Sequence, residues 1–343
     1  MKAKEFINNV LTGMSMGIVV CLIPNALVGE ILKLIIPYVP QLQTILEISI
    51  IAMSLLPVVI GVMTGICFKL TPIQTCSVGL AAFIGSGVYK MNEGVLTLAG
   101  IGTVINIGIT AAAAVLVVQF LAKYLKDFTL IAMPALTMFT AGLFGIFTLP
   151  YVSSASLWVG EGIMFLTSLQ PILMGALIAM VFSVLIISPI STIGVATAIA
   201  LSGIGAGTAN LGVCAAGVGM CIASYRANNF GTAIAHVVSA KIQMRNFFMK
   251  PTIAFPMIIT AAILGALGGY FEIVGTPYSA GFGLGGFVGP LKYLDIVGWD
   301  TGSIILSATL FIALPIVLNV ILLKLFERKF KWIKSDDYRV NYE

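Results

Sequence analysis

The chain has 343 residues, of which 59% are hydrophobic and only 9% charged, with a formal net charge of +5. In soluble domains roughly a quarter of all residues are charged, so this composition excludes a soluble protein. It indicates an all-α polytopic membrane protein, embedded in the lipid bilayer as one domain over residues 1–343. Since one span needs about 20 apolar residues, we expect about ten transmembrane helices.

The apolar segments follow one another along almost the whole chain. The first, after MKAKEF, is expected to be a retained helix, because no small-residue cleavage site follows it. The segment 192–223 is either one tightly packed helix or two halves with a turn near 205–210. The predicted long apolar segments are 6–35, 45–68, 95–122, 128–150, 171–190, 192–223, 251–272 and 302–326, with shorter pieces rich in Gly, Ser and Thr at 71–89, 152–169 and 275–290.

Basic residues gather near the N-terminus, between Arg226 and Lys250, and after Arg328. The positive-inside rule places all three groups in the cytoplasm. We therefore expect a multi-pass protein of the bacterial cytoplasmic membrane with both termini inside and a short tail over 327–343. Topology explains the positive charge, so no nucleic acid partner is predicted.

The sequence contains no recognisable catalytic or cofactor motif. There is no P-loop or zinc motif, and GFGLGG lacks the strand–helix unit of a dinucleotide site. With one histidine and no paired cysteine spacing, no metal site is expected. The prediction is no catalytic residue, no metal and no cofactor, with five free buried thiols at Cys21, Cys67, Cys76, Cys214 and Cys221.

The segment Gly275–Pro290, GTPYSAGFGLGGFVGP, is the strongest candidate for a binding site. It is uncharged, contains six glycines and two prolines, and lies between long apolar segments. Glycine and proline disfavour a helix here. Irregular backbone at membrane depth occurs only where it is buried in protein or lines a watery cavity. The segment is therefore predicted to form a Gly-rich re-entrant hairpin.

Polar residues in and near this segment are the candidate substrate-binding groups. Hydroxyls and a carboxamide beside loop amides suit a sugar better than an ion or a lipid. Ionisable residues in membrane segments are functional candidates by default, although a helix-end carboxylate or a satisfied histidine is the simpler alternative. The predicted substrate-binding residues are Glu272, Thr276, Tyr278, Ser279, Gly283, Thr208, Asn210, Glu161 and His236.

Short sequence echoes suggest internal repeats. Ile131–Pro134 resembles Ile253–Pro256, and matching glycines and prolines follow in each case, which predicts repeat units over 128–190 and 252–326. GLAAFIG at 79–85 resembles GLGGFVG at 283–289, and a third echo pairs Asn106 with Asn210. Chance matches in a small apolar alphabet are the alternative.

The chain resembles the membrane-embedded IIC components of the bacterial sugar phosphotransferase system. GTPYSAGFGLGGFVGP and SGIGAGTANLG are the stretches that carry the resemblance, which extends over essentially the whole length. More specifically, it resembles the stand-alone IIC-like group related to the perfringolysin regulator. The Gly-Ile-Thr-Glu-Pro and Asn-Glu-Pro motifs of glucose-type members are absent, and Glu272 before Gly275-Thr276-Pro277 is the nearest counterpart.

The resemblance implies a homodimeric permease with about ten helices, whose re-entrant hairpins enclose a sugar. A separate phosphorylated IIB protein would phosphorylate that sugar at the cytoplasmic face, so this chain would be at most the membrane subunit of the enzyme. Two alternatives stay open from the residues: a membrane sensor or regulator without transport, and an ion-coupled carrier independent of phosphotransfer.

Overall fold

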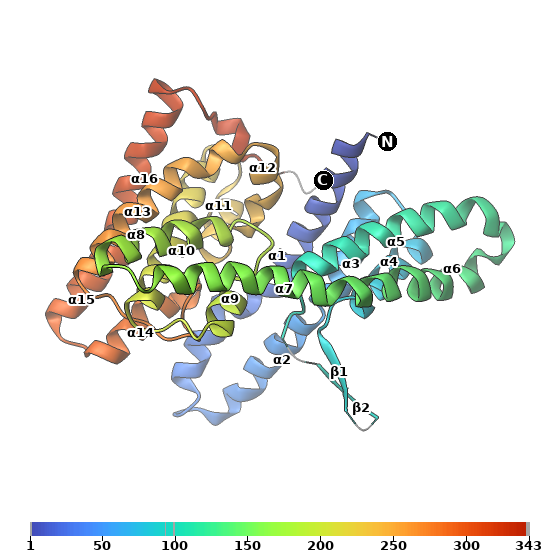
Figure 1. The fold of residues 1–343 in the computed structure, drawn as a ribbon, viewed down its shortest axis with the longest axis horizontal. Coiled ribbons are helices and arrows are strands. Elements are labelled where there is room, and N and C mark those ends of the chain that lie inside the picture. Colours follow the sequence, from blue (N-terminus) through green and yellow to red (C-terminus); the bar gives the residue numbers. More distant parts are fainter. Residues whose placement is uncertain (1, 93, 99, 341–343) are drawn as a thin grey trace. The chain divides into compact units, whose positions relative to one another are not determined.

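The computed structural model describes residues 2–92, 94–98 and 100–340. Its regular structure is helical apart from one two-stranded antiparallel sheet, in which Tyr89 pairs with Leu98 and Asn92 with Val95. The described chain divides into two compact units (Figure 1). Unit 1 comprises residues 2–25 and 32–155, and unit 2 comprises residues 26–31 and 156–340.

Unit 1 contains the N-terminal helices and the hairpin. Helix α1 continues through Pro24, and α2 and α3 bend by 50° at the break between them. The elements are α1 (Ala3–Ile35), α2 (Gln43–Ser54), α3 (Leu56–Cys67), α4 (Pro72–Ile84), β1 (Tyr89–Asn92), β2 (Val95–Leu98), α5 (Val104–Leu125), α6 (Thr129–Thr137), a π-helical turn η3 (Met138–Gly142) and α7 (Leu143–Leu166), which continues into unit 2, with 3-10 turns η1 (Pro40–Leu42) and η2 (Lys126–Phe128).

A buried asparagine on α5 ties three helices of unit 1 together. Asn106 donates through Nδ2 to the carbonyl oxygens of Gly85 (2.6 Å) and Gly145 (2.8 Å). Its Oδ1 accepts from Thr148 at 2.7 Å. The two glycines lie so close to each other that a Cβ on Gly85 would be 2.8 Å from the Cα of Gly145. The ends of α4 and α7 thereby pack through backbone, as small residues allow in membranes.

Unit 2 contains the second half of the chain, including the glycine-rich segment. Its helices are α8 (Pro171–Leu185), α9 (Thr192–Ala198), α10 (Gly203–Tyr225), α11 (Phe230–Val238), α12 (Met244–Met249), α13 (Phe255–Tyr270), α14 (Val288–Val297), α15 (Thr301–Ala308) and α16 (Leu314–Lys324). Shorter turns are η4 (Ala240–Gln243), η5 (Pro251–Ala254), η6 (Gly285–Phe287), η7 (Thr309–Ala313), η8 (Leu325–Lys329) and η9 (Ser335–Tyr338).

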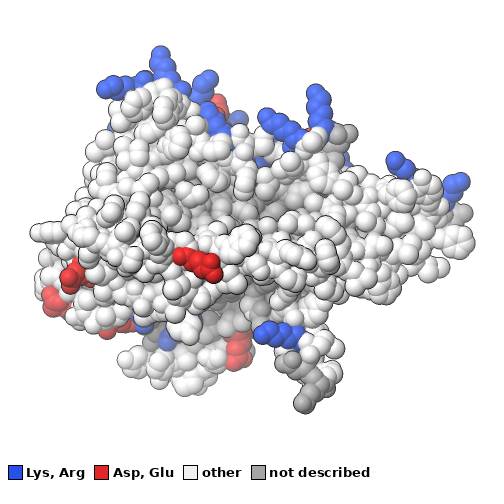
Figure 2. Space-filling model, in the orientation of Figure 1, with Lys and Arg blue, Asp and Glu red and all other residues white. Residues whose placement is uncertain are grey.

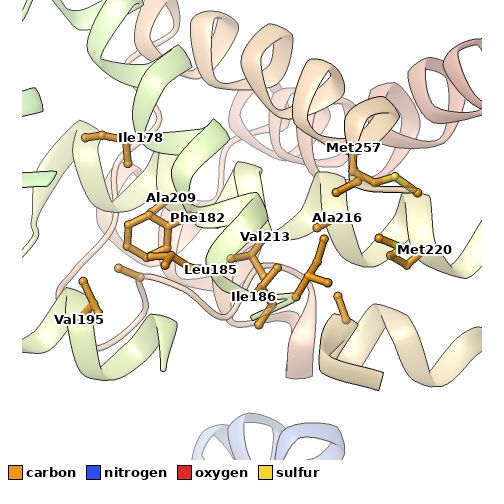
Figure 3. Packing of buried hydrophobic residues seen from close by; sticks show 14 of the residues in the cluster. Ile178, Phe182, Leu185, Ile186, Val195, Ala209, Val213, Ala216, Met220 and Met257 are labelled. Atoms are coloured by element: carbon orange, nitrogen blue, oxygen red, sulfur yellow. The ribbon is translucent and has the colours of Figure 1, made fainter. Parts of the chain in front are cut away.

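Helices α8, α10 and α13 form the core of unit 2. Figure 3 shows Phe182 and Leu185 of α8 facing Ala209 and Val213 of α10. Helices α8 and α13 approach closely because both have glycine at the contact. A Cβ on Gly265 of α13 would overlap the carbonyl oxygen of Gly175 on α8. Residues 205–220 of α10 are buried, and we expect such small-residue packing where lipid supplies no hydrophobic drive between helices.

The C-terminal tail folds back onto unit 2. The carbonyl oxygen of Tyr338 accepts from Asn228 and from Gln243, both at 2.8 Å, and its buried hydroxyl donates to Ile253 O at 2.9 Å. Lys250 and Asp337 form an ion pair of 2.6 Å. The tail predicted over 327–343 is thus bound to the rest of unit 2 as far as residue 340, and residues 341–343 lie outside the described part.

Six helices of the described chain are long and apolar enough to cross a membrane, or seven if the bent pair α2–α3 is one span. The multi-pass, all-α prediction is confirmed in this coarser form, while the expected count of ten is not. Two further apolar helices, α4 and α8, are shorter than a span. Most of the visible surface carries no charged side chain (Figure 2).

Several predicted boundaries differ from the structure. The short pieces rich in Gly, Ser and Thr at 71–89 and 152–169 are largely helical: α4 covers most of the first, and α7 runs without a break from Leu143 through to Leu166 in the second. Of the two alternatives for 192–223, the tightly packed helix is correct from Gly203 onward, and the break lies at 199–202. Among the cysteines, Cys21 and Cys214 are buried, whereas Cys76 is exposed.

The glycine contact between α8 and α13 generates a stability prediction. Gly265→Ala should lower the free energy of unfolding by about 1–3 kcal/mol, because the new methyl group overlaps the Gly175 carbonyl. Gly162→Ala is the matched control, since that helical glycine has no neighbouring atom within 4 Å of a Cβ. It should leave stability unchanged or raise it by about 0.5–1 kcal/mol. Thermal unfolding in detergent measures both, and equal effects would contradict the packing argument.

Candidate solute-binding site

The glycine-rich segment 275–290 lies along the first half of α10. It begins as a two-residue bridge, in which Gly203 and Gly275 exchange backbone hydrogen bonds of 3.0 and 3.1 Å. Farther on, a Cβ at Gly283 would be 2.9 Å from the backbone nitrogen of Cys214. Helix α10 has 23 residues and is therefore about 34 Å long, with Cys214 near its midpoint. The loop thus reaches half-way along a helix of membrane-spanning length.

Asn210 of α10 supplies the polar group that holds the loop in this position. Its Oδ1 accepts from the backbone nitrogens of Phe282 (3.2 Å) and Gly283 (3.1 Å). The side chain is buried, so these two amides obtain from the protein the acceptor that water would otherwise provide. Beside them Gly289 returns to within 3.3 Å of the Asn210 Cβ, measured from its ideal Cβ position. The loop backbone therefore passes Asn210 twice, first at Phe282 and Gly283 and again at Gly289.

A short turn at the start of the loop uses its hydroxyl residues. The nitrogen of Thr276 donates to Ser279 Oγ at 2.9 Å, and the nitrogen of Ser279 donates to Thr276 Oγ1 at 3.2 Å. Ser279 is buried by this arrangement, while Tyr278 between them is 81% exposed. Of the predicted hydroxyl groups, Thr276 and Tyr278 are the more accessible, and Ser279 shapes the turn.

Four residues of the loop have positive φ: Gly281, Gly283, Gly286 and Phe287. Gly283 has φ +60°, and the position has no space for a side chain beside Val213. Phe287 has φ +58°, a backbone conformation that is unusual for an aromatic residue, and its ring is half exposed. Backbone strain of this kind persists only where surrounding structure enforces it.

Glu272 follows the end of α13 and precedes the loop. It has φ +52°, the conformation in which the residue after a helix end is usually glycine. The nitrogen of Ile273 closes the helix end by donating to the Gly268 carbonyl at 2.8 Å. The carboxylate is exposed, so a charged side chain occupies a glycine position beside the loop.

The structure does not bring Thr208 or Glu161 to the loop through hydrogen bonds. Thr208 is buried on α10, where its hydroxyl donates to the Ile204 and Gly205 carbonyls of its own helix. Glu161 is exposed on α7. Glu161 forms no hydrogen bond with another candidate residue in the described chain. The cluster around the loop is therefore smaller than the predicted set.

His236 lies in a separate buried network. Its Nδ1 is 2.7 Å from Thr232 O, and since a carbonyl can only accept, Nδ1 carries the proton. Nε2 then accepts from Gln243 Nε2 at 3.1 Å, and the same Gln243 amide donates to Tyr338 O. Both ring nitrogens are engaged. In this arrangement His236 joins α11 to the C-terminal tail.

Two residues in or near the loop's contacts, Thr192 and Lys241, were not among the predicted site residues. Thr192, at the start of α9, donates to the carbonyl of Gly281 at 2.9 Å. Lys241 was assigned to a cytoplasmic basic group, but it is buried, and burial lowers its pKa to about 7. The sequence signal for Lys241 was its position as the one charged residue between His236 and Arg245.

Comparison with protein families identifies one relationship. A family described as phosphotransferase system, EIIC, matches residues 8–340. The match covers nearly the entire chain, including α10 and the glycine-rich loop. Comparison with curated proteins and with solved structures gives no match.

The buried His236 network generates a prediction on pH dependence. Desolvation lowers the pKa of His236 to about 4, despite the carbonyls that accept from Nδ1. The unfolded chain takes up its proton near pH 6.5, so between about pH 6.5 and 4 the unfolded state binds more protons. The free energy of unfolding should therefore fall on acidification across this range, by on the order of 3 kcal/mol.

Denaturation of the wild-type chain and of His236→Asn at several pH values measures this contribution. The variant cannot titrate at this position, so its stability should decline less steeply between pH 6.5 and 4. Parallel curves for the two proteins would mean that His236 is protonated equally easily in the folded and unfolded states.

Proposed function

Because the chain belongs to the phosphotransferase system EIIC family, as a membrane component of that transport system, we propose that it binds and translocates a sugar or a related small polar solute. The observation that carries this proposal is the contact between Asn210 and the loop amides of Phe282 and Gly283. It holds an uncharged loop with exposed polar groups half-way along a helix of spanning length.

The chemistry of the loop supports a hydroxyl-rich solute. Thr276 provides a hydroxyl, Tyr278 an exposed ring and phenol, and Glu272 a carboxylate that accepts hydrogen bonds from hydroxyl groups. Sugars combine dense hydroxyl groups with apolar faces on which aromatic rings stack. We assign Glu272, Thr276 and Tyr278 to solute contact, with Ser279, Gly283 and Asn210 shaping the loop.

Further features follow from family membership as parts of the same proposal. A phosphorylated IIB partner transfers phosphate to the solute at the cytoplasmic side, where the basic groups and both termini lie under the positive-inside rule. The segment 275–290 acts as a re-entrant hairpin in a homodimer of about ten-helix subunits. The internal repeats over 128–190 and 252–326 likewise remain a prediction, as do roles for Thr208, Glu161 and His236 in binding.

A ligand screen tests the function directly. The purified chain should show a thermal shift with one class of sugar or polyol and not with amino acids or inorganic ions. Vesicles that contain the chain should then accumulate that solute in phosphorylated form when a phosphorylated IIB protein is supplied. Binding without uptake would favour a sensor, and uptake driven by an ion gradient would favour an ion-coupled carrier.

Glu272 variants separate solute contact from backbone conformation. Glu272→Gly should raise the free energy of unfolding by about 1 kcal/mol, because it relieves the left-handed strain at this helix end. Glu272→Gln keeps the shape of the side chain and removes its charge. Both variants should lose most of the solute-induced thermal shift, and undiminished binding by Glu272→Gly would remove Glu272 from the site.

Two loop glycines provide a matched pair for transport. Gly283→Ala places a methyl group 2.8 Å from Val213 at a left-handed position, so it should abolish uptake by displacing the loop. At Gly285 the nearest atom to a new methyl group is Val238 O at 3.4 Å, so Gly285→Ala should transport almost normally. Uptake is measured in vesicles with matched protein amounts. Normal uptake by Gly283→Ala would mean that the loop has no part in transport.

A further inference from the structure

Lys241 lies buried in unit 2, in the turn η4 between α11 and α12. Its Nζ donates to the carbonyl oxygens of Ser188 (2.5 Å) and Ile190 (2.6 Å). Of the ion pairs found in the described residues, none includes Lys241. An apolar side chain would fill this space without the cost of removing an amine from water. The amine therefore needs a specific role, and its contacts indicate that this role is to bind the two carbonyl oxygens.

Both carbonyls belong to the connection between α8 and α9. Ile186 and Ile187 of this connection are buried in the core of unit 2, but its other hydrogen bonds among the described residues are local. Ser188 Oγ donates to Leu185 O and accepts from the nitrogen of Ile190, all within the same turn. The Nζ of Lys241 comes from a different part of the chain and joins the carbonyls of Ser188 and Ile190. Without it, two buried or partly buried carbonyls lose a donor, which is costly where water does not reach.

The next residues connect this segment to the glycine-rich loop. Thr192, two residues after Ile190, donates to Gly281 O at 2.9 Å. Gly281 has φ +90°, and a Cβ there would lie 2.8 Å from the Thr192 Cβ, so the two residues are in direct contact. Gly281 immediately precedes the two amides that bind Asn210. The loop is thus held from one side by α10 and from the other by α9.

We propose that Lys241 is a positioning residue for the glycine-rich loop: its Nζ fixes the 188–190 backbone, which places Thr192 against Gly281. The proposal deepens the proposed function, because it assigns a second support to the loop that we expect to bind the solute. The contacts themselves do not depend on solute identity, so the two proposals can be tested separately.

Hydrogen–deuterium exchange on the full chain in lipid nanodiscs, without any solute, tests the chain of contacts. Lys241→Met preserves the length and apolar volume of the side chain and removes the donors. Backbone amides in 186–192 and 275–290 should then exchange about tenfold faster or more, while α13 keeps its protection. Lys241→Arg retains donors for the two carbonyls and should restore slow exchange in the loop.

Two further variants complete the test. Lys250→Met is the matched control, because it breaks the Asp337 ion pair in the tail and should not change loop exchange. Thr192→Val is close in shape and removes only the bond to Gly281, so it should loosen the loop and leave 186–190 protected. This variant decides the second link even if Lys241→Met does not fold.

Three results would overturn the proposal. The first is faster exchange at 186–192 in Lys241→Met with an unchanged loop. The second is uniform loosening of unit 2 that Lys241→Arg does not reverse, which would indicate a general role in stability. The third is normal loop protection in Thr192→Val. A negative ligand screen would refute the sugar-binding function and would leave these exchange results unaffected.

Discussion

Backbone amides and carbonyls in apolar surroundings need partners within the protein, and this constraint organises unit 2. A segment with six glycines cannot satisfy its own backbone as a helix does. Asn210 supplies one acceptor for two amides, Gly203 supplies a two-bond bridge, and Thr192 supplies a donor for Gly281. Each partner comes from a different part of α9 or α10, so the position of the loop depends on the packing of the whole unit.

Unit 1 meets the same constraint with a similar device. Asn106 on α5 donates to the carbonyls of Gly85 and Gly145, where two helix ends approach through backbone. Asn106 and Asn210 are the residues paired by one of the sequence echoes, and Gly85 and Gly289 correspond in another. The roles are reversed, however: Asn106 donates to carbonyls, and Asn210 accepts from amides. A carboxamide suits both because it carries donor and acceptor on one short side chain.

The sequence was sufficient for the features that depend on composition. An all-α membrane protein and an irregular segment after α13 could be predicted, because charge depletion and glycine content are visible residue by residue. Asn210 was predicted as a substrate-binding residue, and its contact with the loop amides was not predicted. The helical structure of 152–166 could not, since Pro150 and the serines and glycines that follow disfavour helices in water but are tolerated in apolar surroundings.

The burial of Lys241 could not be predicted from the sequence, and a satisfied histidine was only the simpler alternative to a binding role for His236. A lysine in a basic group is ordinarily a solvated, cytoplasmic residue, and its two carbonyl partners lie about 50 residues earlier in the chain. The network of His236 likewise depends on Tyr338, which reaches it only when the tail folds back. Span counting was limited in another way, because α4 and α8 are apolar but short and α2–α3 is bent.

The contact between Gly175 and Gly265 has a mechanical consequence. Two helices that meet backbone to backbone have no side chains between them that can change rotamer and take up a displacement. Helices α8 and α13 should therefore move as one stiff body, and the connections at their ends, 186–191 and 271–275, should move with them.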